Sequence, residues 1–438
     1  MQRRDFVALA GATTVPGLWH RLAADEGQQP PRVNGERLNR HLAELAEHGR
    51  SPTGTRRAAY TDADIAGRRY VTGLMREAGL EVRVDTGGNI VGRREGSARG
   101  LPTILFGSHI DSVPDGGNYD GDVGSMGAIE VAETLAEKRI TTRHPIEVVI
   151  FQNEEGGTIG SKIMAAGLTP AELDGVARSG KTIREGTRLI GGDPERLAEA
   201  RRRPGELLCF FELHIEQGGI LDEAGINIGV VEGIVGIRWY EVTIRGFANH
   251  AGTTPMDRRK DAMLAAAKLT VAVNEIIRAI PGRQVGTVGR ITALPGTVNV
   301  IPGQVVLTID LRDMSVETLR LATGRFHEAA RRIEAETGTS IAFRDLSTNE
   351  PAPTDARLRR IITDGARTLG LTTREMPSGA GHDSQEVARI APVGMIFVPS
   401  VRGISHSPEE LSRPEDITNG ANVLLHSVLT VDRAGLGR

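Results

Sequence analysis

The chain has 438 residues, which exceeds one ordinary hydrophobic core and indicates about two to three domains. Hydrophobic residues make up 39% and charged residues 25%, a balance typical of a soluble globular protein. With 53 Lys and Arg against 56 Asp and Glu, the net charge is −3, so nothing global indicates nucleic-acid or membrane binding. The single cysteine, Cys209, excludes a disulfide framework and a Cys-rich metal site within one chain, and is expected to be a buried, unreactive thiol.

The first 32 residues differ from the rest of the chain. Arg3 and Arg4 precede a mildly apolar stretch, a pattern that resembles a twin-arginine signal for export to the periplasm. Such a signal is an address and contributes nothing to the fold. The alternative is a disordered tail on a cytoplasmic protein. No apolar run reaches 18 residues, so no membrane-spanning helix is expected.

Residues 33–236 alternate between helix and strand patterns. Apolar residues at helical spacing predict the first two helices, and continuous apolar runs predict strands that are buried on both faces. The predicted elements are helices at 36–48 and 62–78, a hairpin of strands at 81–85 and 89–93, and strands at 102–110 and 146–152 around a helix at 125–138. This strand–helix–strand order predicts a layered α/β domain.

A different pattern covers residues 237–346. Residues 238–245 alternate between polar and apolar positions, which predicts a half-exposed strand suited to the edge of a sheet. A helix at 257–280, strands near 285–293 and 304–311, a helix at 315–336 and a last strand at 340–345 follow. We expect one compact antiparallel α+β unit, inserted into a discontinuous α/β domain made of residues 33–236 and 347–438.

Candidate metal ligands follow the buried strand at 102–110. His109 lies near the strand's end, Asp111 comes two residues later, and a Gly-rich loop leads to Asp120 at the start of a helix. Open α/β sheets place their sites at the C-terminal ends of parallel strands. His109 and Asp120 are therefore candidate ligands, and Asp111 is a candidate carboxylate for orienting the His109 imidazole. The alternative is a polar loop that only caps the following helix.

Two adjacent carboxylates, Glu154 and Glu155, follow the next buried strand. They are costly to place there unless a cation or a proton compensates their charge. Successive side chains on a strand point to opposite faces, so one can bind metal while the other serves as a general base. A solvated acidic turn is the alternative.

Two histidines occupy comparable positions later in the chain. His214 lies in the apolar run that ends before Gly218, and His406 lies in a loop after the predicted strand at 393–398. A lone histidine is more often structural than a ligand. Four strand ends in one sheet, each with a histidine or carboxylate, nevertheless favour one shared metal site.

Together these motifs resemble the amidase–hydantoinase–carbamoylase branch of the zinc aminopeptidase-like metallohydrolases, from about residue 35 to 430. The resemblance implies a di-metal α/β catalytic domain with an inserted α+β lid that also forms a homodimer. It implies two divalent ions per subunit, Zn²⁺ foremost, with Mn²⁺, Co²⁺ or Ni²⁺ as alternatives. His109, His214 and a bridging Asp120 would hold one ion, Glu155, His406 and the same Asp120 would hold the other, and Glu154 would be the general base.

The same resemblance implies substrate contacts. In the inserted lid, His250 would reach the partner subunit's site and support the oxyanion, while Asn299 and Arg312 would clamp a substrate carboxylate. A surface ion pair of Arg312 with Asp310 or Asp313 is the alternative.

In the catalytic domain, Gln217 is a candidate for binding the ureido group, and the backbone at Gly381 for contacting the substrate, with His382 supporting the site. The implied reaction is hydrolysis of a linear C–N bond in a small N-carbamoyl or ureido acid, such as an N-carbamoyl amino acid or allantoate. A dipeptidase or aminoacylase with the same metals is the nearest alternative. A non-catalytic binding protein of this fold would be expected to lack Glu154 or a metal ligand, and neither is missing.

Overall fold

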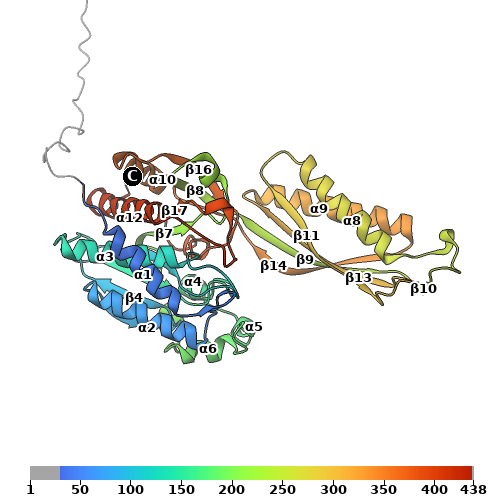
Figure 1. Cartoon of the computed structure of the whole chain (residues 1–438), viewed down its shortest axis with the longest axis horizontal. Coiled ribbons are helices and arrows are strands. Elements are labelled where there is room, and N and C mark those ends of the chain that lie inside the picture. The colour runs from blue at the N-terminus through green and yellow to red at the C-terminus, as the bar shows by residue number, and fades with distance from the viewer. Residues whose placement is uncertain (1–29, 437–438) are drawn as a thin grey trace, which may run out of the picture. The chain divides into compact units, whose positions relative to one another are not determined.

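The computed structural model describes residues 30–436. Nearly all of the expected export signal lies outside these residues. A nine-stranded mixed sheet forms the centre of the larger domain (Figure 1). Its order is β15 (Ala352–Pro353), β8 (Ile228–Ile234), β17 (Val393–Val398), β7 (Leu207–Ile215), β5 (Thr103–His109), β6 (Ile146–Phe151), β4 (Ile90–Arg94) and β3 (Glu81–Val84), and β16 (Thr373–Ser378) also pairs with β8.

The middle of this sheet is parallel. Strand β5 runs parallel to both β6 and β7, and β17 runs parallel to β7, so the C-terminal ends of four strands lie along one edge. Every residue of β5, β6 and β17 is buried, which explains why these strands read as continuous apolar runs. The α/β expectation is confirmed.

Helices cover both faces of the sheet. One face packs against α3 (Asp122–Glu137), α12 (Pro414–Ala434), α1 (Gly35–Glu47), α2 (Asp62–Glu77) and α10 (Ala356–Thr368) in the largest apolar core. The other face carries α4 (Ile159–Ala165) and α11 (Asp383–Val387) over a smaller core around Phe151 and Phe210. Short helices α5 (Pro170–Leu173), α6 (Ile183–Leu189) and α7 (Ile220–Ala224) lie in the connections. Helix α3 begins three residues earlier than the predicted 125, directly after Gly121.

The inserted unit is a four-stranded antiparallel sheet with its own core. Its order is β11 (Val285–Leu294), β13 (Gln304–Asp313), β9 (Gly236–Arg245) and β14 (Ser340–Asn349), and α8 (Ala262–Ala279) and α9 (Val316–Thr337) pack on one face. A separate two-stranded antiparallel sheet pairs β10 (Asn249–His250) with β12 (Val300–Ile301). The separate α+β unit is confirmed.

One expectation about this unit is wrong. The strand predicted at 238–245 is not an edge strand, because β9 pairs with β13 on one side and with β14 on the other. Its alternating pattern arises because α8 and α9 cover only one face of the sheet, where Tyr240, Val242 and Ile244 are buried. The edge strands are β11 and β14.

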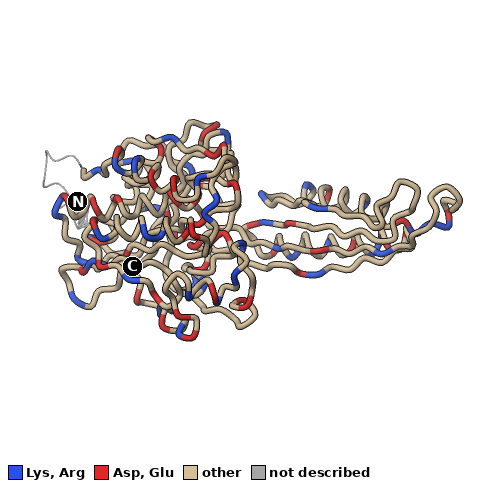
Figure 2. The backbone as a smooth tube through the Cα atoms, turned by 60° about the horizontal axis from the view of Figure 1, so that its bottom comes forward, with Lys and Arg blue, Asp and Glu red and all other residues tan. Residues whose placement is uncertain are grey.

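Acidic and basic residues are interspersed along the chain in Figure 2. Within residues 30–436, no helix is long and apolar enough to cross a membrane.

Candidate metal centre

The parallel strands bring together the five side chains expected as metal ligands. His109 is the last residue of β5, His214 lies near the end of β7, Glu155 follows β6, and His406 lies in the loop beyond β17. Asp120 is in the loop between β5 and α3. These residues form two groups that share Asp120, one with His109 and His214 and one with Glu155 and His406, and the ligand atoms within each group lie within 4.8 Å of one another.

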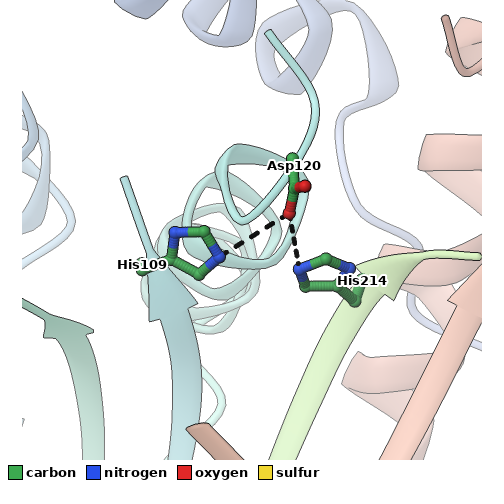
Figure 3. Close-up of side chains that lie close together, drawn as sticks. All are labelled: His109, Asp120 and His214. Atoms are coloured by element: carbon green, nitrogen blue, oxygen red, sulfur yellow. Dashed lines mark ion pairs between the residues drawn. The ribbon is translucent and has the colours of Figure 1, made fainter. Parts of the chain in front are cut away.

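In the first group, two imidazoles face one carboxylate oxygen (Figure 3). Oδ1 of Asp120 is 3.1 Å from Nε2 of His214 and 3.7 Å from Nε2 of His109. The Nδ1 atoms are 3.0 Å from the backbone carbonyls of Ile215 and Asp111, respectively, so the Nδ1–H of each ring donates to a carbonyl and Nε2 is the nitrogen that faces Asp120. Burial lowers the pKa of His109 to about 4, which keeps that ring neutral, the form that binds metal.

The second group uses the other oxygen of the same carboxylate. Oδ2 of Asp120 is 3.1 Å from Nε2 of His406, and Oε1 of Glu155 is 3.8 Å from the same nitrogen. His406 has φ 54, in the left-handed region, and its side chain is half-exposed. Because one oxygen of Asp120 faces each group, the carboxylate is positioned to bridge two cations.

The electrostatics of these groups fit divalent cations. Oε1 of Glu155 is buried without a hydrogen-bond partner among the described residues. Burial, reinforced by the charges of Asp120 and Asp111, raises the pKa of Glu155 to about 8. Despite its burial, Asp120 has a pKa well below its usual range, because His214 and His406 donate hydrogen bonds to it. Several buried carboxylates lie close together here with too little positive charge to balance them, and bound metal ions would supply that charge. Nitrogen and oxygen ligands suit Zn²⁺, Mn²⁺, Co²⁺ and Ni²⁺ alike.

Glu154 lies beside the two groups without belonging to either. Its Oε2 is 3.7 Å from Nε2 of His109, and its side chain is only 10% exposed. Burial, together with the charges of Asp383 and Glu155, raises its pKa well above the usual range. Glu154, Asp120 and Glu155 line a cavity of about 890 Å³, so a substrate in that cavity would meet both metal groups and this carboxylate.

The expected contact between the Asp111 carboxylate and His109 is not formed. The His109 ring donates instead to the backbone carbonyl of Asp111, and the nearest carboxylate oxygen is 3.8 Å away. That carboxylate accepts hydrogen bonds from the backbone N–H groups of Glu154 at 3.0 Å and Glu155 at 3.2 Å. Asp111 therefore holds the turn that carries the two glutamates.

Gln217, Gly381 and His382 all line the cavity. Nε2 of Gln217 donates to Oδ2 of Asp120 at 2.8 Å, so in this structure Gln217 supports the bridging carboxylate. Its Oε1 is buried and has no hydrogen-bond partner within residues 30–436. The ring of His382 lies edge-on against His214, with centroids 4.5 Å apart. His382 is thus packed behind a candidate ligand.

Arg312 also lines the cavity, but its guanidinium is engaged. Nε and Nη2 donate to the two carboxylate oxygens of Asp310, and Nη1 donates to the Gly379 carbonyl at 2.7 Å. The structure therefore shows the ion pair with Asp310 that is the alternative to a substrate clamp.

His250 and Asn299 lie together but do not line the cavity. They neighbour each other where β10 pairs with β12, and the Asn299 carbonyl accepts a hydrogen bond from the Ala251 N–H. Nδ1 of His250 accepts from the backbone N–H groups of Gly252 at 3.0 Å and Thr253 at 3.3 Å, and the side chain is exposed. Within one chain, His250 therefore stabilises its own turn and stays away from the metal groups.

Sequence reasoning missed Glu410, which is 5% exposed. Its Oε1 accepts from the backbone N–H groups of Tyr119 and Asp120, and its Oε2 accepts from the Ser405 hydroxyl and the His406 N–H. One carboxylate thus ties together the loops that carry two candidate ligands. The signal available in the sequence was an acidic residue four positions after His406.

Comparisons with known proteins identify the family of the chain. The family model for "Peptidase family M20/M25/M40" matches residues 105–430. The chain is 41% identical over 402 residues to N-carbamoyl-L-amino acid amidohydrolase of Geobacillus stearothermophilus, covering 90% of this chain and 98% of that protein. It is 34% identical over 388 residues to allantoate amidohydrolase of Escherichia coli (strain K12), covering 87% and 94%.

A solved structure shows the same fold. The crystal structure of an amidase of the hydantoinase/carbamoylase family from Burkholderia multivorans has a TM-score of 0.84 at 40% identity, with 92% of this chain and 99% of that chain covered. The chain is therefore a hydrolase of peptidase family M20/M25/M40, within its hydantoinase/carbamoylase amidase branch.

Proposed function

We propose that this protein hydrolyses a linear amide C–N bond in a small N-carbamoyl or ureido acid. The observation that carries the proposal is the position of Glu154 in one cavity with two ligand groups that share Asp120. The relatives named as N-carbamoyl-L-amino acid and allantoate amidohydrolases support this substrate class.

The candidate site residues have different roles in the proposed reaction. His109, His214 and Asp120 would hold one divalent cation, and Asp120, Glu155 and His406 the other. Bound there, two cations supply Lewis acidity that lowers the pKa of water and polarises a carbonyl. Glu154 takes the proton from the attacking water and returns it to the leaving nitrogen. Asp111 holds the Glu154–Glu155 turn by accepting both backbone N–H groups.

Further features belong to the same proposal. The ions are Zn²⁺ first, with Mn²⁺, Co²⁺ and Ni²⁺ as alternatives, because the donor set does not choose among them. The active unit is a homodimer in which the lid presents His250 and Asn299 to the neighbouring site. The substrate carboxylate displaces Asp310 from Arg312 and contacts the backbone at Gly381, and Gln217 turns to the ureido group. The N-terminal arginine pair directs export to the periplasm.

A substrate panel tests the proposal. Purified protein is stripped with a chelator, reloaded with Zn²⁺ or Mn²⁺, and given N-carbamoyl amino acids, allantoate, N-acetyl amino acids and dipeptides. Ammonia should appear with a carbamoyl or ureido acid and should not appear before the metal is restored. Turnover of only the N-acetyl amino acids or dipeptides, without ammonia, would replace the proposal by an aminoacylase or dipeptidase.

A further inference from the structure

Within residues 30–436, the cavity is lined by one Lys or Arg side chain without a hydrogen-bonded carboxylate of its own. Among the described residues, its lining includes Lys162, Arg178 and Arg312 as the Lys and Arg side chains. Lys162 is paired with Glu172, and Arg312 with Asp310. In the part of the chain that the structure describes, Arg178 comes no closer to a carboxylate than 3.9 Å, the distance from its Nη1 to Oε2 of Glu155. Its side chain is 43% exposed, so its guanidinium can reach a ligand in the cavity.

The position of Arg178 is set by an ordered turn. The backbone N–H of Ala177 donates to the Lys181 carbonyl at 2.8 Å, and that of Gly180 donates to the Ala177 carbonyl at 2.9 Å. Gly180 has φ 81, a conformation that favours glycine. The Lys181 ammonium donates to the Tyr60 carbonyl at 3.2 Å, which ties the turn to the catalytic domain. Arg178 is therefore presented to the cavity by a fixed backbone.

The partner that Arg178 approaches has another role. Glu155 belongs to the second metal group, and a divalent cation there would offset its charge. The attraction between Glu155 and Arg178 is then weakened, and the guanidinium becomes available to an anion in the cavity. A planar guanidinium can bind a carboxylate through two parallel hydrogen bonds.

We propose that Arg178 determines specificity by binding a second carboxylate, on the side chain of the substrate. The inference rests on the proposed function, in which Arg312 takes the first carboxylate. Val176, which is 71% exposed, lines the cavity in the same turn, so methylene groups would lie beside Val176 and a terminal carboxylate beside Arg178. The expected substrate class is an N-carbamoyl amino acid with an acidic side chain.

An isosteric substrate pair tests this assignment. N-carbamoyl-L-glutamate and N-carbamoyl-L-glutamine have nearly the same size and differ in the charge of the side-chain terminus. Wild-type kcat/KM should be about 10- to 100-fold higher for the glutamate compound, as expected for one charge-assisted hydrogen-bonded pair. In Arg178→Gln this ratio should fall to about one, mainly through a higher KM for the glutamate compound. Arg178→Lys keeps the charge, loses the planar fork and should give an intermediate ratio.

Arg184→Gln is the matched control. Arg184 lies on α6, pairs with Asp174 and Glu195, and does not line the cavity, so the wild-type ratio should persist. Equal wild-type kcat/KM for the two compounds, or a ratio that survives Arg178→Gln, overturns the role of Arg178. If the enzyme hydrolyses other carbamoyl or ureido acids but neither of these two compounds, the role of Arg178 is also overturned. The proposed function is unaffected by that result. The absence of ammonia from every carbamoyl and ureido acid overturns the proposed function itself.

Discussion

Glu154 and Glu155 are neighbours in the chain but face different partners. Glu154 approaches Nε2 of His109, whereas Glu155 approaches Nε2 of His406, and one Glu155 oxygen has no hydrogen bond from the described part of the chain. The backbone at both residues is held by the Asp111 carboxylate. This arrangement lets one carboxylate bind a cation while the other carries a proton.

The first prediction separates the two roles. Glu154→Gln keeps the size of the side chain but cannot accept a proton, so kcat should fall by about 10²- to 10⁴-fold. The protein should still bind two metal ions per chain, as measured by elemental analysis. Glu155→Gln, its matched comparison, should lose metal from the second group. Activity of Glu154→Gln within a few fold of wild type would rule out the general-base role.

The sequence was enough to predict that the residues at the strand ends lie close together, but it was not enough to predict their individual contacts. Parallel strands must bring their C-terminal ends to one edge, so the order of motifs was enough to place His109, Glu155 and His214 together. Which atom meets which neighbour depends on details of a few tenths of an ångström. The Asp111 carboxylate accepts from the Glu154 N–H, and the Arg312 guanidinium donates to Asp310. The local sequence does not distinguish these partners from the expected ones.

At the scale of elements, the buried strands were the most predictable. A strand buried on both faces has an apolar run that ends where burial ends, so β17 spans the predicted 393–398. Helix ends were less predictable, because caps and turns decide them. The helix predicted from 257 begins at Ala262, since a 3₁₀ turn at Met256–Arg258 comes first and the Asp261 side chain caps the helix.

The Glu410 carboxylate connects two loops that carry candidate ligands, and this connection leads to the second prediction. An amide in place of this carboxylate has one acceptor oxygen, so it cannot satisfy both the Tyr119–Asp120 loop and the Ser405–His406 loop. In Glu410→Gln, metal affinity should fall by about 10- to 100-fold, with the larger loss at the group that includes His406. Metal titration of the stripped protein by calorimetry measures this effect.

Glu409→Gln provides the control for this experiment. Glu409 is adjacent in the chain, its side chain is 67% exposed, and its contact is with Arg402. Its metal affinity should match wild type. Equal metal affinities of Glu410→Gln and wild type would show that the Glu410 carboxylate does not position the ligands.

At the scale of the whole molecule, the sequence pattern could not predict which strands pair with β9. Strand β14 pairs with β9 about 100 residues later in the chain, and a half-exposed alternating strand looks the same at an edge or in the interior. With β9 in the interior, β11 becomes a candidate edge for another chain. It exposes Val285, Ile291 and Leu294, at 55%, 48% and 50%, and an unpaired edge with apolar side chains is a template for a neighbouring strand.

The last prediction concerns a site shared between two chains. His250 stabilises its own turn through Nδ1 and does not line the cavity of its own chain, so a catalytic role would require the neighbouring site. His250→Ala and Glu154→Gln should each be nearly inactive. In a mixed dimer, one site then receives both lesions and the other receives none. Random equal mixing should restore about a quarter of wild-type activity, because half of the dimers are mixed and each has one intact site of two.

A second mixture controls for simple stabilisation. Asp120→Ala and Glu154→Gln both alter the site that belongs to their own chain, so every site in their mixed dimers carries a lesion and activity should stay low. Native mass spectrometry establishes that mixed dimers have formed. If they form and the His250→Ala mixture recovers no more activity than this control, His250 acts only as a turn residue within its own lid, because a shared site would then have to be intact and yet inactive.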